Sequence, residues 1–218
     1  MLDTRLTMIF DLLPQGILCD IGTDHCKLAV HAVESLRAPF AFATDLRKGP
    51  LSAADRLIKK HGLENKITTM LSNGFLDIPK EVFESVDCFV IAGMGGELIA
   101  NIIKGRPTDK YMVLQPMTAI NELIEFLSKN GYAVKKRKFC RDGEKIYTAM
   151  LVKYDGVTRE PDLYFASERD ELFYDYLNRE RSRVTKVIAA LNGSEKADKS
   201  RIPELEGLLA IIESELKK

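Results

Sequence analysis

Short apolar runs alternate with helical stretches over the first 130 residues, and this alternation restricts the possible folds more than any other feature of the chain. Each run is four to six residues long and precedes a segment whose apolar residues recur at helical spacing. Strands and helices that alternate in this way form a parallel sheet with helices on both faces. The predicted strands span 17–21, 40–44, 66–71, 88–92 and 111–114, and the predicted helices span 50–61, 79–84, 98–104 and 120–130, with another between 28 and 33.

The pattern changes after Gly131. Two strand-like runs, 132–139 and 146–152, flank the turn-prone Arg141-Asp142-Gly143, which predicts a β-hairpin that closes the sheet. Two amphipathic stretches follow, 167–191 and 203–216, and their apolar stripes predict a helical hairpin joined by a polar loop. We therefore expect an α/β, Rossmann-like domain over residues 1–157 and a small C-terminal helical hairpin over residues 158–218.

The N-terminal segment and the cysteines indicate the compartment. Leu2, Leu6, Ile9 and Leu13 recur at helical spacing, which predicts a helix rather than a signal peptide. No apolar run approaches the length that spans a bilayer, so we expect a cytoplasmic protein without a membrane partner. The cysteines form no C-x-x-C pair, which favours free thiols, and no metal-ligand spacing occurs, so no metal is expected. The four cysteines are Cys19, Cys26, Cys88 and Cys140.

The turn after the first predicted strand contains Asp20, Gly22, Thr23, Asp24 and His25. In a Rossmann-like sheet this turn contacts the ligand, and a glycine there permits close approach of the backbone. The turn lacks the G-x-G-x-x-G pattern of dinucleotide sites and is acidic, so it would repel a pyrophosphate. Its carboxylates suit the sulfonium and ammonium groups of S-adenosylmethionine. We also expect a side chain of the turn, Thr23 or Asp24, to cap the next helix.

Polar or small residues follow the other strands at the same expected edge of the sheet. Asp45 stands where a Rossmann-like fold places an acceptor for ribose hydroxyls, and Asn73 could accept from an adenine amino group. Three glycines at 93, 95 and 96 surround Met94 and would leave a flat surface for a planar substrate. Gln115 would place an amide beside the acceptor. Each of these residues is also compatible with a plain turn.

Basic residues gather in two segments, although 32 Lys and Arg cancel 32 Asp and Glu over the whole chain. Such clusters can neutralise a phosphate backbone, which makes RNA a candidate partner. The alternative is an ordinary solvated surface, which we favour for the tail cluster taken alone. The hairpin cluster comprises Lys129, Lys135, Lys136, Arg137, Lys138, Arg141 and Lys145, and the tail cluster comprises Arg179, Arg183 and Lys186.

Four segments, read together, resemble one family. They are DIGTDH, ATDLRKGPLSAA, IAGMGGELI and LQP, in this order and spacing. They resemble the bacterial tRNA (adenine-22-N1)-methyltransferase family over nearly the whole chain. The resemblance implies a class I methyltransferase sheet, with parallel strands closed by an antiparallel hairpin, followed by a coiled-coil-like pair of helices. It also implies methyl transfer from S-adenosylmethionine to N1 of an adenine in tRNA.

The resemblance also implies roles for particular residues, and it leaves two alternatives open. A small-molecule methyltransferase would share the fold, and a noncatalytic RNA-binding relative would agree with Met117, which stands where the family usually has Asn. Asn73 stands where the family usually has Asp, and Lys27 where it has an aromatic residue. We expect Asp20, Gly22, Thr23, Asp45, Asn73 and Gly93 to bind the cofactor, Asp24, His25 and Gln115 to act in catalysis, and Met94, Gly95, Gly96, Lys136, Arg137 and Arg183 to bind substrate.

Overall fold

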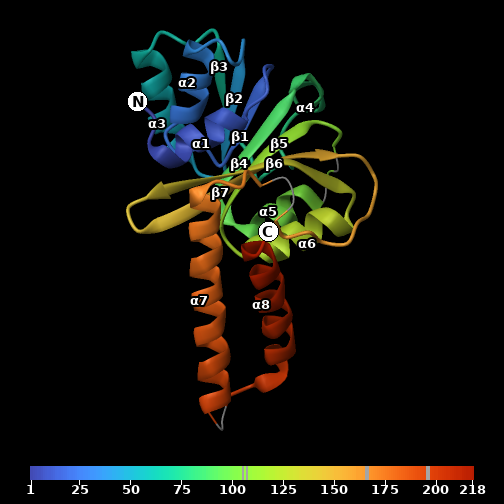
Figure 1. The fold of residues 1–218 in the computed structure, drawn as a ribbon. Coiled ribbons are helices and arrows are strands. Elements are labelled where there is room, and N and C mark those ends of the chain that lie inside the picture. Colours follow the sequence, from blue (N-terminus) through green and yellow to red (C-terminus); the bar gives the residue numbers. More distant parts are fainter. Residues whose placement is uncertain (105, 107, 165–166, 195–196) are drawn as a thin grey trace. The chain divides into compact units, whose positions relative to one another are not determined.

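The chain folds into two compact units, Met1–Ser167 and Glu168–Lys218, in a computed structural model (Figure 1). The structure describes residues 1–104, 106, 108–164, 167–194 and 197–218. The polar loop predicted between the tail helices includes residues 195 and 196, which lie outside the described residues. The first unit holds the sheet and the second holds two long helices, so each unit is described by itself.

A seven-stranded sheet forms the centre of the first unit, in the strand order β3-β2-β1-β4-β5-β7-β6. The first five strands are parallel, and β7 pairs antiparallel with both β5 and β6. This arrangement confirms the predicted parallel sheet closed by a hairpin. The strands are β1 (Leu18–Ile21), β2 (Ala41–Asp45), β3 (Ile67–Leu71), β4 (Cys88–Gly95), β5 (Tyr111–Thr118), β6 (Tyr132–Asp142) and β7 (Lys145–Tyr154).

Helices cover both faces of this sheet, and two hydrophobic clusters fill the space between the layers. Successive residues of β4 alternate between the clusters: Val90 belongs to the cluster under α1, α2 and α3, while Phe89 and Ile91 belong to the cluster under α4, α5 and α6. The central strands are therefore apolar on both faces, which explains their continuous apolar runs. The helices are α1 (Thr4–Leu12), α2 (Lys27–Glu34), α3 (Lys48–Lys60), α4 (Lys80–Ser85), α5 (Gly96–Lys104) and α6 (Ile120–Lys129).

The second unit is a pair of helices, α7 (Glu171–Gly193) and α8 (Ile202–Leu216), with a short 3-10 helix at Lys199–Arg201. Asp170 caps α7 by accepting a hydrogen bond from the Phe173 amide at 2.8 Å. The predicted stripes face inward: Phe173 and Leu177 of α7 and Ile212 of α8 are buried. This packing confirms the helical hairpin. No described helix is long and apolar enough to cross a membrane.

The sheet unit continues past residue 157 because the segment that follows β7 packs back onto β6. Arg137 of β6 donates a hydrogen bond to the Leu163 carbonyl and forms an isolated bridge with Ser167. The ring of Tyr164 is buried in this region. The structure therefore places the boundary between its two units after Ser167.

Strand β4 runs directly into helix α5, which differs from the predicted turn between Ala92 and Leu98. The strand continues to Gly95 and the helix begins at Gly96, with register shifts around Met94. A Cβ atom on Gly96 would lie 2.1 Å from the carbonyl oxygen of Ala119. Only glycine therefore allows the start of α5 to pass the backbone between β5 and α6.

Gly96→Ala should destabilise the protein by about 1–3 kcal/mol, because the added methyl group meets backbone that cannot move aside like a flexible side chain. Urea unfolding measures the effect as a lower midpoint with an unchanged slope. Gly49→Ala is the control, since a Cβ at this α3 position meets nothing within 4 Å. Equal stabilities for the two variants would contradict the proposed contact.

Candidate active site

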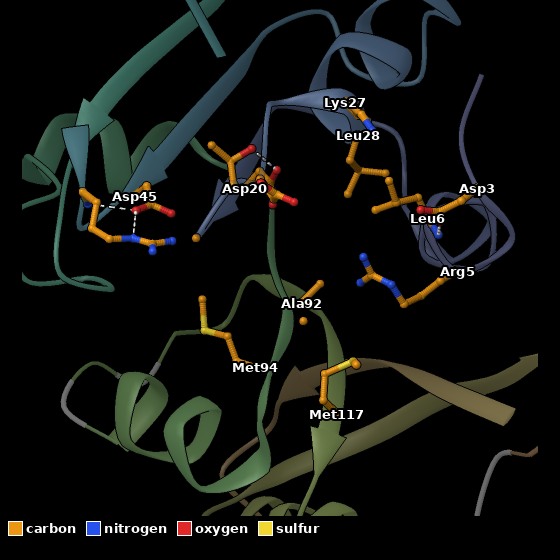
Figure 2. A pocket seen from close by; sticks show the side chains of 15 residues that line it. Asp3, Arg5, Leu6, Asp20, Lys27, Leu28, Asp45, Ala92, Met94 and Met117 are labelled. Atoms are coloured by element: carbon orange, nitrogen blue, oxygen red, sulfur yellow. Dashed lines mark hydrogen bonds and ion pairs between the residues drawn. The ribbon is translucent and has the colours of Figure 1, made fainter. Parts of the chain in front are cut away.

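A cleft of about 510 Å³ opens at the carboxyl ends of β1, β2 and β4 (Figure 2). The strand order reverses between β1 and β4, because the chain builds β2 and β3 on one side of β1 and β4 and β5 on the other. Ligands of open α/β sheets bind at such a reversal. Residues from α1, the β1–α2 turn and the ends of β2, β4 and β5 line the cleft.

Asp20, the central acid of the cleft, is 7% exposed and belongs to β1. Its Oδ2 accepts a hydrogen bond from the Thr23 hydroxyl at 2.7 Å. Burial raises the pKa of Asp20 to about 6, and the carboxylates of Asp24 and Asp45 add to this, while the Thr23 hydrogen bond and Arg5 oppose it. A cationic ligand would stabilise the ionised form of a carboxyl group in this environment.

The turn that follows β1 has an unusual backbone. Gly22 has φ +74°, and a Cβ there would lie 2.1 Å from Cε of Met94 across the cleft. His25 and Cys26 have positive φ angles of 61° and 58°. This conformation is strained for residues other than glycine, and such strained residues cluster at functional sites. The amides of Gly22 and Thr23 both donate to the Thr44 carbonyl at 2.8 Å, which holds the turn against β2.

The outer part of the turn is exposed. Asp24 lines the cleft and its side chain is 89% exposed, and the His25 ring lies 3.3 Å from it. His25 itself lines a neighbouring groove rather than the cleft. Helix α2 begins after Cys26 without a side-chain cap. The expectation that Thr23 or Asp24 caps this helix is therefore wrong, because the Thr23 hydroxyl donates to Asp20 instead.

Asp45 ends β2 beside the turn and is 7% exposed. Its Oδ1 accepts a hydrogen bond from the Arg47 amide at 2.8 Å and lies 3.5 Å from Arg47 Nε. Figure 2 shows Asp20 and Asp45 on the same side of the cleft, with Met94 facing them. The structure thus brings together the two acids that the sequence placed at neighbouring strand ends.

Arg5 of α1 is a cleft residue that the sequence analysis did not single out. Its Nη1 donates to Oε1 of Gln115 at 2.9 Å, and the Gly93 amide donates to the same oxygen at 3.2 Å. The Gln115 amide nitrogen donates to the Pro116 carbonyl at 2.9 Å. Gln115 is fully buried and does not line the cleft, and its Oε1 accepts from both Arg5 and the Gly93 amide. The position of Arg5 next to Leu6, in the apolar stripe of the first predicted helix, was the feature of the sequence that could have indicated a partly buried arginine.

Asn73, Gly95 and Gly96, which were predicted to contact ligands, do not line the cleft. Asn73 is exposed, and its backbone amide donates to Asp77 Oδ2 at 2.9 Å. It lines a separate cavity of about 340 Å³ together with Leu98 and Asn101. Gly96 is buried against Ala119, so its assignment to substrate binding is corrected to a packing role. Among the glycines of β4, Gly93 lines the cleft, whereas Gly95 packs beside Thr118.

The basic residues of the hairpin differ in exposure, so they do not form one continuous basic surface. Arg137 is 1% exposed, and its Nε donates to the Thr148 hydroxyl at 2.9 Å, so the prediction that it binds substrate is wrong. Lys138 forms an ion pair with Asp11 at 3.2 Å, whereas Lys136 is exposed on β6. In the second unit, Arg183 forms an ion pair with Glu180 at 2.8 Å.

The cysteines near the cleft are buried. All four cysteines are free and buried, which confirms the expected free thiols. Burial raises the pKa of the Cys26 thiol to about 12, so this group stays protonated beside the turn. Within the described ranges, no cluster of three or more His, Cys, Asp or Glu side chains could hold a metal ion.

Residues 2–150 match a family model described as a methyltransferase domain. The chain belongs to this family. The match includes every residue that lines the cleft. The fold and the cleft of this methyltransferase therefore agree with its sequence family.

Individual proteins are similar over almost the full chain. A tRNA (adenine(22)-N(1))-methyltransferase of Bacillus subtilis is 28% identical over 94% of this chain and 92% of its own. The structure of an uncharacterized Listeria monocytogenes protein has a TM-score of 0.87 at 26% identity, covering all of both chains. Sp1610 of Streptococcus pneumoniae, a candidate tRNA (m1A22) methyltransferase crystallised with S-adenosyl-L-methionine, has a TM-score of 0.84 at 26% identity, covering 99% of this chain and 100% of its own. These similarities confirm the resemblance drawn from the four motifs.

Asp20→Asn should make the stability of the ligand-free protein less dependent on pH. The folded protein holds the Asp20 proton more tightly than the unfolded chain, because burial raises the pKa from 3.8 to about 6. Stability of the wild-type protein should therefore fall as pH rises from about 4 to about 6, and this part of the fall should be absent in the variant.

Urea unfolding of both proteins between pH 4 and 7 measures this difference. Asp24→Asn is the matched control, because it removes an exposed carboxylate from the same turn. A wild-type-minus-variant difference that stays constant across the window would contradict the buried, raised-pKa carboxyl group.

Arg5→Met and Gln115→Met should show non-additive effects on stability, because the two side chains share a hydrogen bond. The double variant should lose about 1 kcal/mol less than the sum of the single variants. Arg37 provides the control: its Nη1 donates to the Leu13 carbonyl at 3.0 Å, so Arg37→Met and Gln115→Met should be additive. Additivity in both pairs would refute the coupling.

Proposed function

We propose that this protein is an S-adenosylmethionine-dependent tRNA methyltransferase that acts on N1 of adenine-22. The observation that carries the proposal is an acid-lined cleft at the strand-order reversal, in a chain that aligns over 94% of its length with a curated enzyme of this activity. The fold by itself would not decide between methyltransferases. The extent of the alignment, which includes the second unit, favours a tRNA enzyme over a small-molecule methyltransferase.

The residues of the cleft fit the chemistry of S-adenosylmethionine. Asp20 and Asp24 provide acceptors for its ammonium group and stabilise its sulfonium, and Arg5 provides donors for its carboxylate. Asp45 provides an acceptor for the ribose hydroxyls. These assignments support the earlier prediction for the turn and add Arg5 to it, whereas the assignment of adenine to the Asn73 loop stays a prediction.

The reaction requires positioning more than proton transfer. S-adenosylmethionine supplies a methyl group that is already activated by the sulfonium, and adenine N1 has a free lone pair at neutral pH. The residues therefore need to hold the donor and the base in line. Met94 and Met117 line the side of the cleft opposite Asp20 and Asp45, where we place the target base.

Three polar residues were predicted to act in catalysis, and their surroundings suggest different roles. Asp24 lines the cleft and is the candidate to orient the base or its amino group. His25 sits beside it at the edge of the neighbouring groove. Gln115 is a positioning residue, since its buried amide holds Arg5 and the Gly93 amide.

The tRNA substrate also needs contacts outside the cleft. Lys136 on the hairpin and Arg183 on α7 remain candidates for phosphate contacts, because both side chains are exposed. A tRNA-modifying enzyme acts where tRNA matures, so we assign the protein to the cytoplasm.

The purified protein should transfer radiolabel from S-adenosylmethionine to unmodified bacterial tRNA, and nucleoside digestion should place the label in N1-methyladenosine. A tRNA with guanine at position 22 should receive none. Asp24→Ala should lower kcat by roughly 10-fold or more, because base orientation is lost. Glu64→Ala, an exposed residue before β3, is the control for charge removal.

The alternative functions predict other outcomes of this assay. Cofactor binding without label in any tRNA would favour a noncatalytic RNA-binding relative or another acceptor, and would refute the proposed activity. Label in N1-methyladenosine with unchanged activity of Asp24→Ala would keep the activity and reject the role of Asp24.

A further inference from the structure

A second hollow lies beside the cleft, with a volume of about 360 Å³. Its lining comes from the turn after β1, the start of α2 and one side of α3. Lys27 lines both this hollow and the cleft, so the two are neighbours at that residue. We call this hollow the α3 groove, and define it by its lining residues His25, Lys27, Ala53, Arg56, Leu57 and Lys60.

The polar side chains that line the α3 groove are all basic. Lys27, Arg56 and Lys60 carry positive charge, and His25 gains one when it is protonated; no carboxylate lines the groove. The whole chain has equal numbers of basic and acidic residues, 32 of each. The charge of the α3 groove is therefore a local feature and does not reflect a generally basic surface.

The cations of the α3 groove lack partners within the described part of the chain. Lys27, Arg56 and Lys60 form no ion pair there, and all three are exposed. The nearby Asp55 accepts a hydrogen bond from the Thr69 hydroxyl at 2.7 Å, so it points toward β3. Asp24 lies beside His25 at 3.3 Å.

The spacing on α3 has an energetic consequence. Arg56 and Lys60 are four residues apart, so they are neighbours on the helix surface. Like charges at this spacing destabilise a helix, whereas an anion bound between them would make the pair stabilising. The arrangement is therefore unfavourable in the free protein and favourable in a complex with an anion.

We propose that the α3 groove binds the phosphate backbone of the RNA substrate beside the cleft. The inference rests on the proposed function and adds a substrate contact to it. The cations come from the start of α2 and from one side of α3, so they are spread along the groove, which suits successive phosphates of one strand better than a single small anion. On the hairpin, in contrast, Arg137 is buried and Lys138 is paired with Asp11.

The test is the double variant Arg56→Gln and Lys60→Gln, compared with Lys59→Gln and Lys66→Gln. Both variants remove two exposed positive charges, but Lys59 and Lys66 do not line the α3 groove. In the groove variant, the KM for tRNA should rise about 5- to 20-fold near physiological salt, and the salt dependence of tRNA binding should weaken by about one to two phosphate contacts. The Kd for S-adenosylmethionine should stay unchanged in both variants.

The outcomes separate this inference from the proposed function. If the wild-type protein methylates tRNA and the groove variant keeps the same KM and salt dependence as the control, the α3 groove is not an RNA contact. If the wild-type protein methylates no tRNA, the proposed function fails, and fluorescence anisotropy with the same tRNA tests the groove by the same comparison. A larger loss of binding to a poly-glutamate peptide than to tRNA would assign the groove to an acidic protein and overturn the proposal.

Discussion

The reversal of strand order between β1 and β4 is the constraint on which the rest of the site depends. The chain adds β2 and β3 on one side of β1, then returns to build β4 and β5 on the other side. The connections leave the carboxyl ends of β1 and β4 in opposite directions, so the helices that follow them, α2 and α5, pack on opposite faces of the sheet. The cleft forms there, and the residues that end each strand become its walls.

Asp20 shows what this position means for stability. Its carboxyl group lies in the cleft wall but is largely withdrawn from water, which raises its pKa to about 6. The ionised form is therefore disfavoured in the free protein and becomes favourable when a positively charged ligand is present. The proposed cofactor carries such charges. Binding sites often lower the stability of the free protein in this way and are stabilised when the ligand binds.

The site also depends on contacts between elements that are far apart in the sequence. Gln115 of β5 accepts hydrogen bonds from Arg5 of α1 and from the Gly93 amide of β4, and so connects three elements around one buried amide. Gly96 has a comparable role, since its missing side chain lets α5 pass the backbone at Ala119. These contacts align the cleft wall on the side where the substrate base is proposed to bind.

The sequence by itself determined the sheet, its closing hairpin, the helical pair and the acids at the strand ends. Those features depend on local periodicity and on the topology that alternating strands and helices impose, so Asp20 and Asp45 could be placed together from spacing alone. The tertiary structure decided which residues of different helices and strands come into contact. Arg5 reaches Gln115 across 110 positions of sequence, Arg137 is buried by a segment that returns onto β6, and Lys27 joins Arg56 beside the cleft. Periodicity says which side of an element is buried but not which residue of another element it meets, because that partner is selected by packing over the whole domain.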